Sequence, residues 1–241
     1  MIKVGLFGKN SDSIRHLIPE YGLELVEDHP EVIISYGGDG TLLSAERKYP
    51  SIPKLPIRDS KVCKKCSIHT TEHLLAKLAE DKIKLENYPK LEAKFNGESI
   101  LSFNDLVIRN SIPIHALRFR VYINEKIIKP ELIIGDGIVL TTVFGSSGYY
   151  KSITRQTIDK NFAIAFNNTT EEIEPIKFPA SDQIKAEIIR GPGTLSSDNN
   201  SKLFTLKEGD TVQIGASAHS AQIYVEKTLR CDDCVILRDK R

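Results

Sequence analysis

The hydrophobic pattern of the sequence changes near Lys84, and this change constrains the fold more than any other feature. Before it, short apolar segments such as residues 1–8 and 31–36 alternate with segments of helical periodicity. Residues 70–78 are the clearest helix, with leucines along one side. After Lys84, short strands follow one another with turns between them. The first pattern is typical of an α/β layer and the second of a β-sandwich.

We therefore expect two domains. Residues 1–90 are expected to form an N-terminal α/β domain, and residues 91–226 a C-terminal β-sandwich. The polar tail, residues 227–241, is expected to pack back on the first domain and complete it. The strands expected in the second domain are residues 91–95, 99–103, 118–123, 138–142, 162–166, 182–189, 202–206 and 212–215.

Three local signals predict where single elements begin or turn. Either threonine of the pair 70–71 is expected to cap the helix that follows. Residues 11–21 are expected to form a short helix capped by Ser11 or Asp12. The Asn-Gly pair at 96–97 predicts a hairpin between two strands.

Composition excludes several classes of protein. The chain has 241 residues, with 33 Lys and Arg against 32 Asp and Glu, so its formal net charge is +1. Such a balance gives no reason to expect binding to nucleic acid or to an anionic membrane surface. No apolar run approaches the ~20 residues that span a bilayer, and the first residues lack the pattern of a secretory signal. We expect a cytoplasmic, soluble protein.

All four cysteines occur in two C-x-x-C pairs, Cys63 with Cys66 and Cys231 with Cys234. Each pair places two thiolates on one turn, and two such turns can complete a tetrahedral metal site. We expect the four to share a structural metal, and Zn²⁺ is the metal that thiolates favour. A redox pair and four unconnected surface thiols are the alternatives.

The sharpest chemical signal is the run Gly37, Gly38, Asp39, Gly40 and Thr41, which follows an apolar strand and opens a helix. Glycines allow the backbone to approach a ligand closely, and the N–H groups at a helix start suit phosphate. A carboxylate would repel phosphate, but it can accept a proton from a hydroxyl nucleophile or hold Mg²⁺. The alternative is a plain turn in which Asp39 caps the helix.

A second signal is a buried strand that follows Asp136 and ends in a small, hydroxyl-rich turn. Ser147 and Gly148 lie in this turn and can offer hydrogen bonds to a nucleotide, while Tyr149 offers a ring for stacking on a base. A hairpin turn with two half-buried tyrosines, Tyr149 and Tyr150, is the alternative.

The third signal is the polar pair Asn104 and Asp105 at the entry to a buried strand. Asn104 can bind a base or an amide, and Asp105 can accept protons from ribose hydroxyls. A capping role or an Asx turn is the alternative.

Together these three segments resemble the NAD kinase family. Residues 37–41 match its G-G-D-G-T, residues 104–105 stand for its N-E, and residues 136–149 for its D-G-x-x-x-[ST]-T-P-T-G-S-T-A-Y. The resemblance continues at residues 174–179, 195–198 and 208–210, and so covers nearly the whole chain. It implies an α/β domain, a β-sandwich and a nucleotide in the cleft between them.

The resemblance also implies an activity and roles for residues. Members of the family transfer a phosphoryl group from ATP or polyphosphate to the 2′-hydroxyl of the adenosine ribose of NAD, with Mg²⁺ on the donor phosphates. Asp39 would accept the hydroxyl proton. The other implied site residues are Gly37, Gly38, Gly40 and Thr41 near phosphate, Asn104 and Asp105 on NAD, Asp136 on its nicotinamide half, and Ser147, Gly148 and Tyr149 as the adenosine wall.

Some positions depart from the family's pattern. Asp105 is one methylene shorter than the family's Glu, and residues 58–66 replace a loop of pattern N-x-G-x-L-G-F. The remaining departures are Val143, Phe144, Thr154, Arg155 and, after Asp198, Asn199 in place of glycine.

These departures leave alternatives open. The first is a kinase of the same fold that acts on another hydroxyl, in an inositol, a sugar or a lipid. The second is a non-catalytic nucleotide-binding relative. The donor (ATP or polyphosphate) and the acceptor (NAD or NADH) also stay open, while the resemblance suggests a homodimer or homotetramer.

Overall fold

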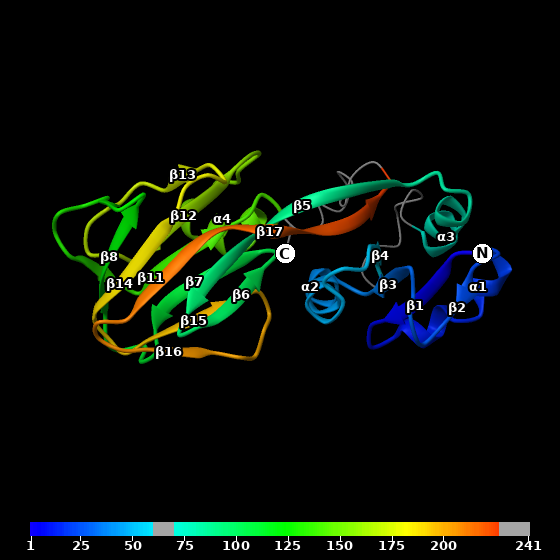
Figure 1. Cartoon of the computed structure of the whole chain (residues 1–241), viewed down its shortest axis with the longest axis horizontal. Coiled ribbons are helices and arrows are strands. Elements are labelled where there is room, and N and C mark those ends of the chain that lie inside the picture. Colours follow the sequence, from blue (N-terminus) through cyan, green and yellow to red (C-terminus); the bar gives the residue numbers. More distant parts are fainter. Residues whose placement is uncertain (60–69, 227–241) are drawn as a thin grey trace. The chain divides into compact units, whose positions relative to one another are not determined.

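The computed structural model describes residues 1–59 and 70–226, and the chain divides into two compact units (Figure 1). Unit 1 comprises Met1–Tyr88 together with the residues from Ala221 on, and unit 2 comprises Pro89–Ser220. Two long strands, β5 (Lys84–Phe95) and β17 (Thr211–Val225), contribute residues to both units.

Unit 1 is an α/β layer built on parallel strands, as its sequence pattern predicts. The strands run in the order β4-β3-β1-β2, and the end of β17 pairs with β4. Every residue of β3 is buried, which is usual for a parallel strand covered on both faces. The elements are β1 (Lys3–Phe7), η1 (Ser11–Ile14), α1 (Leu17–Glu20), β2 (Glu24–Leu25), β3 (Val32–Tyr36), α2 (Asp39–Lys48), β4 (Lys54–Ile57) and α3 (Thr71–Ala79).

The helix α3 confirms its sequence signals. Thr70 is the N-cap, and its Oγ1 accepts the backbone N–H of His73 at 3.2 Å. The buried side chains of Leu74, Leu75 and Leu78 join the apolar core of the unit. The helix therefore forms because a good cap precedes an apolar stripe of helical period.

The prediction of a single helix over residues 11–21 is wrong. The structure has a 3₁₀ turn, η1, and then a separate short helix, α1. Pro19 explains the break, because a proline ring clashes with the carbonyl four residues earlier, here that of Arg15. The predicted N-cap, Ser11 or Asp12, is also wrong. The N-cap residue of η1 is Asn10, and its side chain makes no capping hydrogen bond.

Unit 2 is a sandwich of two antiparallel sheets, as expected. One sheet contains the run β10-β8-β14-β17 with β5, β6 and β9, and the other has the order β13-β12-β11-β7-β15-β16. Side chains of both sheets, among them Phe119, Ile184, Leu106 and Ile164, form one apolar core. A shared core between two sheets is what defines a sandwich.

Each strand expected in unit 2 overlaps an observed strand, but residues 126–127, 133–135, 176–178 and 193–197 form strands that the sequence pattern did not predict. The strand expected at residues 91–95 is the end of the longer β5. The strand expected at residues 212–215 is the start of the much longer β17. The hairpin at Asn96 and Gly97 is confirmed, with φ angles of 49° and 79° that suit a type I′ turn. The other elements are β6 (Glu98–Ser102), β7 (Asp105–Asn110), β8 (Leu117–Ile123), β9 (Lys126–Ile127), β10 (Ile133–Gly135), β11 (Gly137–Thr141), η3 (Gly145–Ser147), α4 (Tyr149–Thr154), β12 (Phe162–Asn167), β13 (Ile176–Phe178), β14 (Ile184–Arg190), β15 (Gly193–Ser197) and β16 (Phe204–Leu206).

Within residues 1–59 and 70–226, no helix combines the length and the apolar character that crossing a membrane requires.

Candidate functional site

The glycine turn of unit 1 connects the buried strand β3 to helix α2. Gly37 has a φ of +156°, and a Cβ at this position would lie 2.3 Å from Oγ1 of Thr41. Glycine is therefore required for the turn to close on the first turn of the helix. Gly38 is the N-cap residue and Asp39 the first residue of α2, so the alternative in which Asp39 caps the helix is wrong.

The carboxylate of Asp39 lies at the surface beside a cation. Its side chain is 44% exposed, and Oδ1 lies 3.2 Å from Nη2 of Arg58, which directly follows β4. Arg58 belongs to the loop that departs from the family's pattern. Its positive charge offsets the repulsion that a carboxylate alone would exert on a phosphate.

A cavity of about 520 Å³, wide open to solvent, lies beside the first turn of α2. Its volume is within the range of small-ligand sites. Gly40 and Thr41, two of the residues predicted to bind phosphate, line it, and Lys9 adds a positive charge. The full lining is Leu6, Phe7, Gly8, Lys9, Ser11, Gly40, Thr41 and Ser44.

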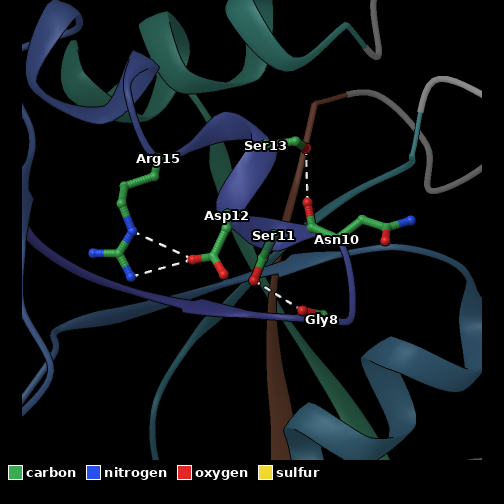
Figure 2. A network of polar contacts seen from close by, with 6 residues as sticks. All are labelled: Gly8, Asn10, Ser11, Asp12, Ser13 and Arg15. Atoms are coloured by element: carbon green, nitrogen blue, oxygen red, sulfur yellow. Dashed lines mark hydrogen bonds and ion pairs between the residues drawn. The ribbon is translucent and has the colours of Figure 1, made fainter.

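The wall of this cavity that follows β1 is held by short-range hydrogen bonds, which Figure 2 shows. The hydroxyl of Ser11 donates to the carbonyl of Gly8 at 2.9 Å, and that of Ser13 donates to the carbonyl of Asn10 at 2.7 Å. The side chain of Asn10 also donates to Asp59 at 2.9 Å. The turn after β1 is thus tied to the segment that carries Arg58.

In unit 2, Asn104 directly precedes β7 and Asp105 is its first residue, at the predicted entry to a buried strand. The Oδ1 atom of Asn104 is buried and has no hydrogen-bond partner among the described residues. Asp105 is only 9% exposed, and burial together with the negative charge of nearby Asp198 raises the pKa of its carboxyl group to about 7. Asn104 therefore offers a buried hydrogen-bond acceptor, and Asp105 a buried carboxyl group, to a polar ligand.

Asp136 lies between β10 and β11, held by two amide side chains. Asn110 donates to its Oδ1 at 3.3 Å, and Asn168 donates to its Oδ2 at 3.2 Å. These two contacts orient the carboxylate, while its predicted contact with the nicotinamide half of NAD stays a prediction.

The hydroxyl-rich turn after β11 forms η3 and the start of α4. Ser147 ends η3, Gly148 is the N-cap of α4, and Tyr149 is its first residue. The hydroxyl of Tyr149 accepts a hydrogen bond from Asn167 at 3.1 Å. Tyr150 is completely buried, so the alternative with two half-buried tyrosines is wrong, because this ring belongs to the apolar core around α4.

The structure brings the second and third sequence signals together within unit 2. The hydroxyl of Thr142 donates to the carbonyl of Phe103 at 2.7 Å, and the backbone N–H of Thr142 donates to that of Asn104 at 2.9 Å. A Cβ on Gly145 would lie 2.2 Å from the Asn104 carbonyl, so the close approach requires glycine. The rings of Phe103 and Phe144 stack with centroids 4.1 Å apart. Phe144, a departure from the family's pattern, thus joins the two segments.

The four cysteines predicted to hold a metal, Cys63, Cys66, Cys231 and Cys234, lie outside the described residues. Within residues 1–59 and 70–226, no three His, Cys, Asp or Glu side chains gather closely enough to hold a metal ion. The shared zinc site therefore stays a prediction.

Sequence reasoning missed two residues, Arg58 and Asp198. In the sequence, Arg58 stands out only as part of a loop that departs from the family's pattern, and its contact with Asp39 spans 19 residues. Asp198 stands out only for its match to a family segment, and it contacts residues 93 to 96 positions away. For both Arg58 and Asp198, the one sequence signal that could have indicated a role is a single charged residue in a turn.

Comparisons with known proteins agree with this arrangement. No protein-family model matches the chain. The chain is 30% identical over 169 residues to an NAD kinase of Sulfurisphaera tokodaii, an alignment that covers 66% of each chain. It is also 30% identical over 156 residues to an NAD kinase 2 of Bacillus licheniformis, covering 61% of this chain and 57% of that one.

The chain belongs to the NAD kinase family.

Two solved structures share the fold of this family member. One is an NAD kinase from Archaeoglobus fulgidus in complex with ATP, with a TM-score of 0.74 and 17% identity over 94% of each chain. The other is a yeast NADH kinase complexed with NADH, with a TM-score of 0.75, 14% identity, and coverage of all of this chain and 87% of that one. The matched part of the chain spans 57% to 66% of the length of the two relatives compared by sequence.

Proposed function

We propose that the protein is an NAD kinase that transfers the γ-phosphoryl group of ATP to the 2′-hydroxyl of the adenosine ribose of NAD. The observation that carries the proposal is Asp39, exposed on the first turn of α2 beside Arg58 and next to two residues that line a cavity. Membership of the NAD kinase family supports NAD over another hydroxyl acceptor. The ATP bound by the Archaeoglobus fulgidus relative supports ATP as the donor.

In this proposal Asp39 accepts the proton of the 2′-hydroxyl as the oxygen attacks the γ-phosphorus. The bond from that phosphorus to the bridging oxygen breaks, and ADP leaves. General base catalysis of this kind contributes ~10²–10⁴ in rate. Gly37, Gly38, Gly40 and Thr41 let the backbone lie close to donor phosphates, where the helix start favours negative charge.

On the acceptor side, the proposal assigns NAD binding to residues of unit 2. Asn104 and Asp105 offer a buried amide oxygen and a buried carboxyl group to hydroxyl or amide donors. Asp136 is assigned to the nicotinamide half. The turn formed by Ser147, Gly148 and Tyr149 is assigned to the adenosine.

Mg²⁺ fits this donor set, because it is usually held by one or two carboxylates and the phosphates of the substrate. Asp39 is the carboxylate at the predicted phosphate site that suits such a role. Bound with ATP, the ion would neutralise charge on the donor phosphates.

Three finer predictions accompany the proposal. A structural Zn²⁺ on Cys63, Cys66, Cys231 and Cys234 is supported by their paired spacing. We expect one metal ion per chain. Changing the cysteines to serine should remove the metal and lower the melting temperature by several degrees, and a metal-free protein of equal stability would contradict this prediction.

The other two predictions are a homodimer or homotetramer, which rests on the family resemblance, and a cytoplasmic location, which rests on composition.

The acceptor is tested by offering several hydroxyl compounds to the purified protein with Mg²⁺ and γ-labelled ATP. We expect label to move to NAD or NADH, and not to myo-inositol, glucose or diacylglycerol. Polyphosphate in place of ATP tests the donor. Transfer to one of the other hydroxyl compounds, with none to NAD or NADH, would contradict the proposal.

A further inference from the structure

The carboxylate of Asp198 gathers four hydrogen-bond donors from one short segment. Its Oδ1 accepts from the hydroxyl of Ser102 at 2.7 Å and from the backbone N–H groups of Asn104 at 2.7 Å and Asp105 at 3.2 Å. Its Oδ2 accepts from the N–H of Phe103 at 2.9 Å. A single carboxylate thus satisfies three successive backbone donors and one side chain.

Successive N–H groups that converge in this way form a concave anion site. Such concavities commonly hold phosphate, but here the anion comes from the chain itself. The link is reciprocal, because the N–H of Asp198 donates to the carbonyl of Asp105 at 3.0 Å. Asp198 adopts a φ of +48°, a conformation that Asp tolerates better than most residues.

The opposite side of the same segment is held equally firmly. The carbonyl of Phe103 accepts from the hydroxyl of Thr142, and that of Asn104 accepts from the backbone of Thr142 and, at 3.3 Å, from the hydroxyl of Thr141. The backbone donors and acceptors of Phe103 and Asn104 are therefore occupied. Their conformation has little freedom left.

The side chain of Asn104 contrasts with its satisfied backbone. Its Oδ1 is buried with no partner among the described residues, and an unsatisfied buried acceptor is costly. A ligand that donates a hydrogen bond here removes that cost. Because the backbone is held on both sides, the Cα–Cβ bond of Asn104 keeps its direction, and the burial of Oδ1 limits the rotamers of the side chain.

We propose that Asp198 is a positioning residue for NAD: it holds the segment Phe103–Asp105 so that Asn104 and Asp105 meet the dinucleotide. The inference rests on the proposed function for the identity of the ligand. Asp198 itself need not touch NAD, since its oxygens are already occupied by the chain.

The test compares Asp198→Asn with Asp210→Asn in the full chain. The side chain of Asn accepts hydrogen bonds at its oxygen but not at its NH2 group. In Asp198→Asn, the NH2 group therefore faces one of the donors of this segment, and the negative charge that attracts the other donors is lost. Asp210 is a matched control in the same unit, because its carboxylate accepts a backbone N–H, that of Lys207, at 2.7 Å in another turn. Calorimetric titration gives the Kd for NAD and for ATP, and amide hydrogen exchange reports on residues 103–105 directly.

We expect Asp198→Asn to weaken NAD binding at least tenfold, to leave the Kd for ATP within twofold, and to speed exchange at residues 103–105 at least tenfold. Asp210→Asn should do none of these. Unchanged NAD binding, or unchanged exchange at residues 103–105, in Asp198→Asn would overturn the proposal. Equal losses in both variants would also overturn it, because they would reflect stability alone.

A milder variant covers the case in which Asp198→Asn does not fold. Ser102→Ala removes one of the four donors and should raise the Kd for NAD by about threefold, with no change for ATP; an unchanged Kd for NAD would count against the proposal. Failure of the proposed function is distinguishable, since it would appear as a wild-type protein that binds NAD but forms no NADP.

Discussion

Arg58 and Asp39 form an ion pair with 3.2 Å between Nη2 and Oδ1, and both side chains are partly exposed. A pair in contact with water contributes little to stability, about 0–1 kcal/mol. Its position matters more than its strength, because it places a planar cation beside the proposed proton acceptor. A guanidinium group is well suited to bind phosphate oxygens as well.

Replacing Arg58 should therefore affect catalysis more than folding. We expect Arg58→Ala to lower kcat/KM for NAD at least tenfold, and Arg58→Lys to lose less because it keeps the charge. Steady-state kinetics with thermal unfolding of the same preparations measures both effects. Arg15→Ala is the matched control, since Arg15 pairs with Asp12 at 3.3 Å on the surface of the same unit. Equal activity of the Arg58→Ala and Arg15→Ala variants would contradict the role of Arg58.

Asp105 should make stability depend on pH. Its pKa in the folded protein is about 7, above the ordinary value of 3.8, so the folded state binds the proton more tightly than the unfolded state. This contribution to the free energy of unfolding is fully present below about pH 4 and is lost as the pH rises to about 7. Asp105→Asn keeps a neutral side chain, so its stability relative to the wild type should increase over this range by a few kcal/mol. Urea unfolding of both proteins at pH 5 and pH 8 measures the difference, and a constant difference would refute the prediction.

Arg155 ends α4 in the left-handed conformation, with φ 62° and ψ 8°. Side chains with a Cβ are disfavoured there by about 1 kcal/mol, whereas glycine is not. Arg155→Gly should thus stabilise the protein by up to about 1 kcal/mol. Arg155→Ala, which keeps the Cβ, should give no such gain. Chemical denaturation compares the two variants, and an alanine variant as stable as the glycine variant would show that the backbone is not the cause.

Glu46 of α2 and Lys54 of β4 form a buried ion pair, with Lys54 fully buried and Glu46 3% exposed. Removing one partner of such a pair leaves a charge in a poorly solvated site. Glu46→Gln should destabilise the protein by about 3–5 kcal/mol. Glu80→Gln is the control, because Glu80 and Lys82 pair at 2.8 Å with both side chains more than half exposed. A loss below 1 kcal/mol for Glu46→Gln would show that the pair is not effectively desolvated.

Local signals predicted the elements that depend on local chemistry. The cap of α3, the hairpin at Asn96 and Gly97, and the turn before Asp39 each follow from a few neighbouring residues. The long strand β17 was predicted only in its first part. Residues 216–221, Ala-Ser-Ala-His-Ser-Ala, contain none of the β-branched or aromatic residues that favour strands, and β17 continues through them because it pairs with other strands.

The candidate site was predicted as separate motifs rather than as an arrangement. The sequence identified Asn104 and Asp105, but not that Asp198 holds them from more than 90 positions away. In the same way, the burial that raises the pKa of Asp105 depends on packing that no local pattern encodes. Contacts of this kind depend on the fold as a whole.

The measurement that tests the central claim most directly is the structure of the product formed from NAD, ATP and Mg²⁺. We expect the wild-type protein to form NADP with the new phosphate on the 2′-oxygen of the adenosine ribose, identified by ³¹P NMR. Asp39→Asn should reduce the rate by at least 10²-fold, as expected for loss of a general base, whereas Asp12→Asn should leave it unchanged. No phosphorylated dinucleotide, or an Asp39→Asn variant as active as the wild type, would contradict the account.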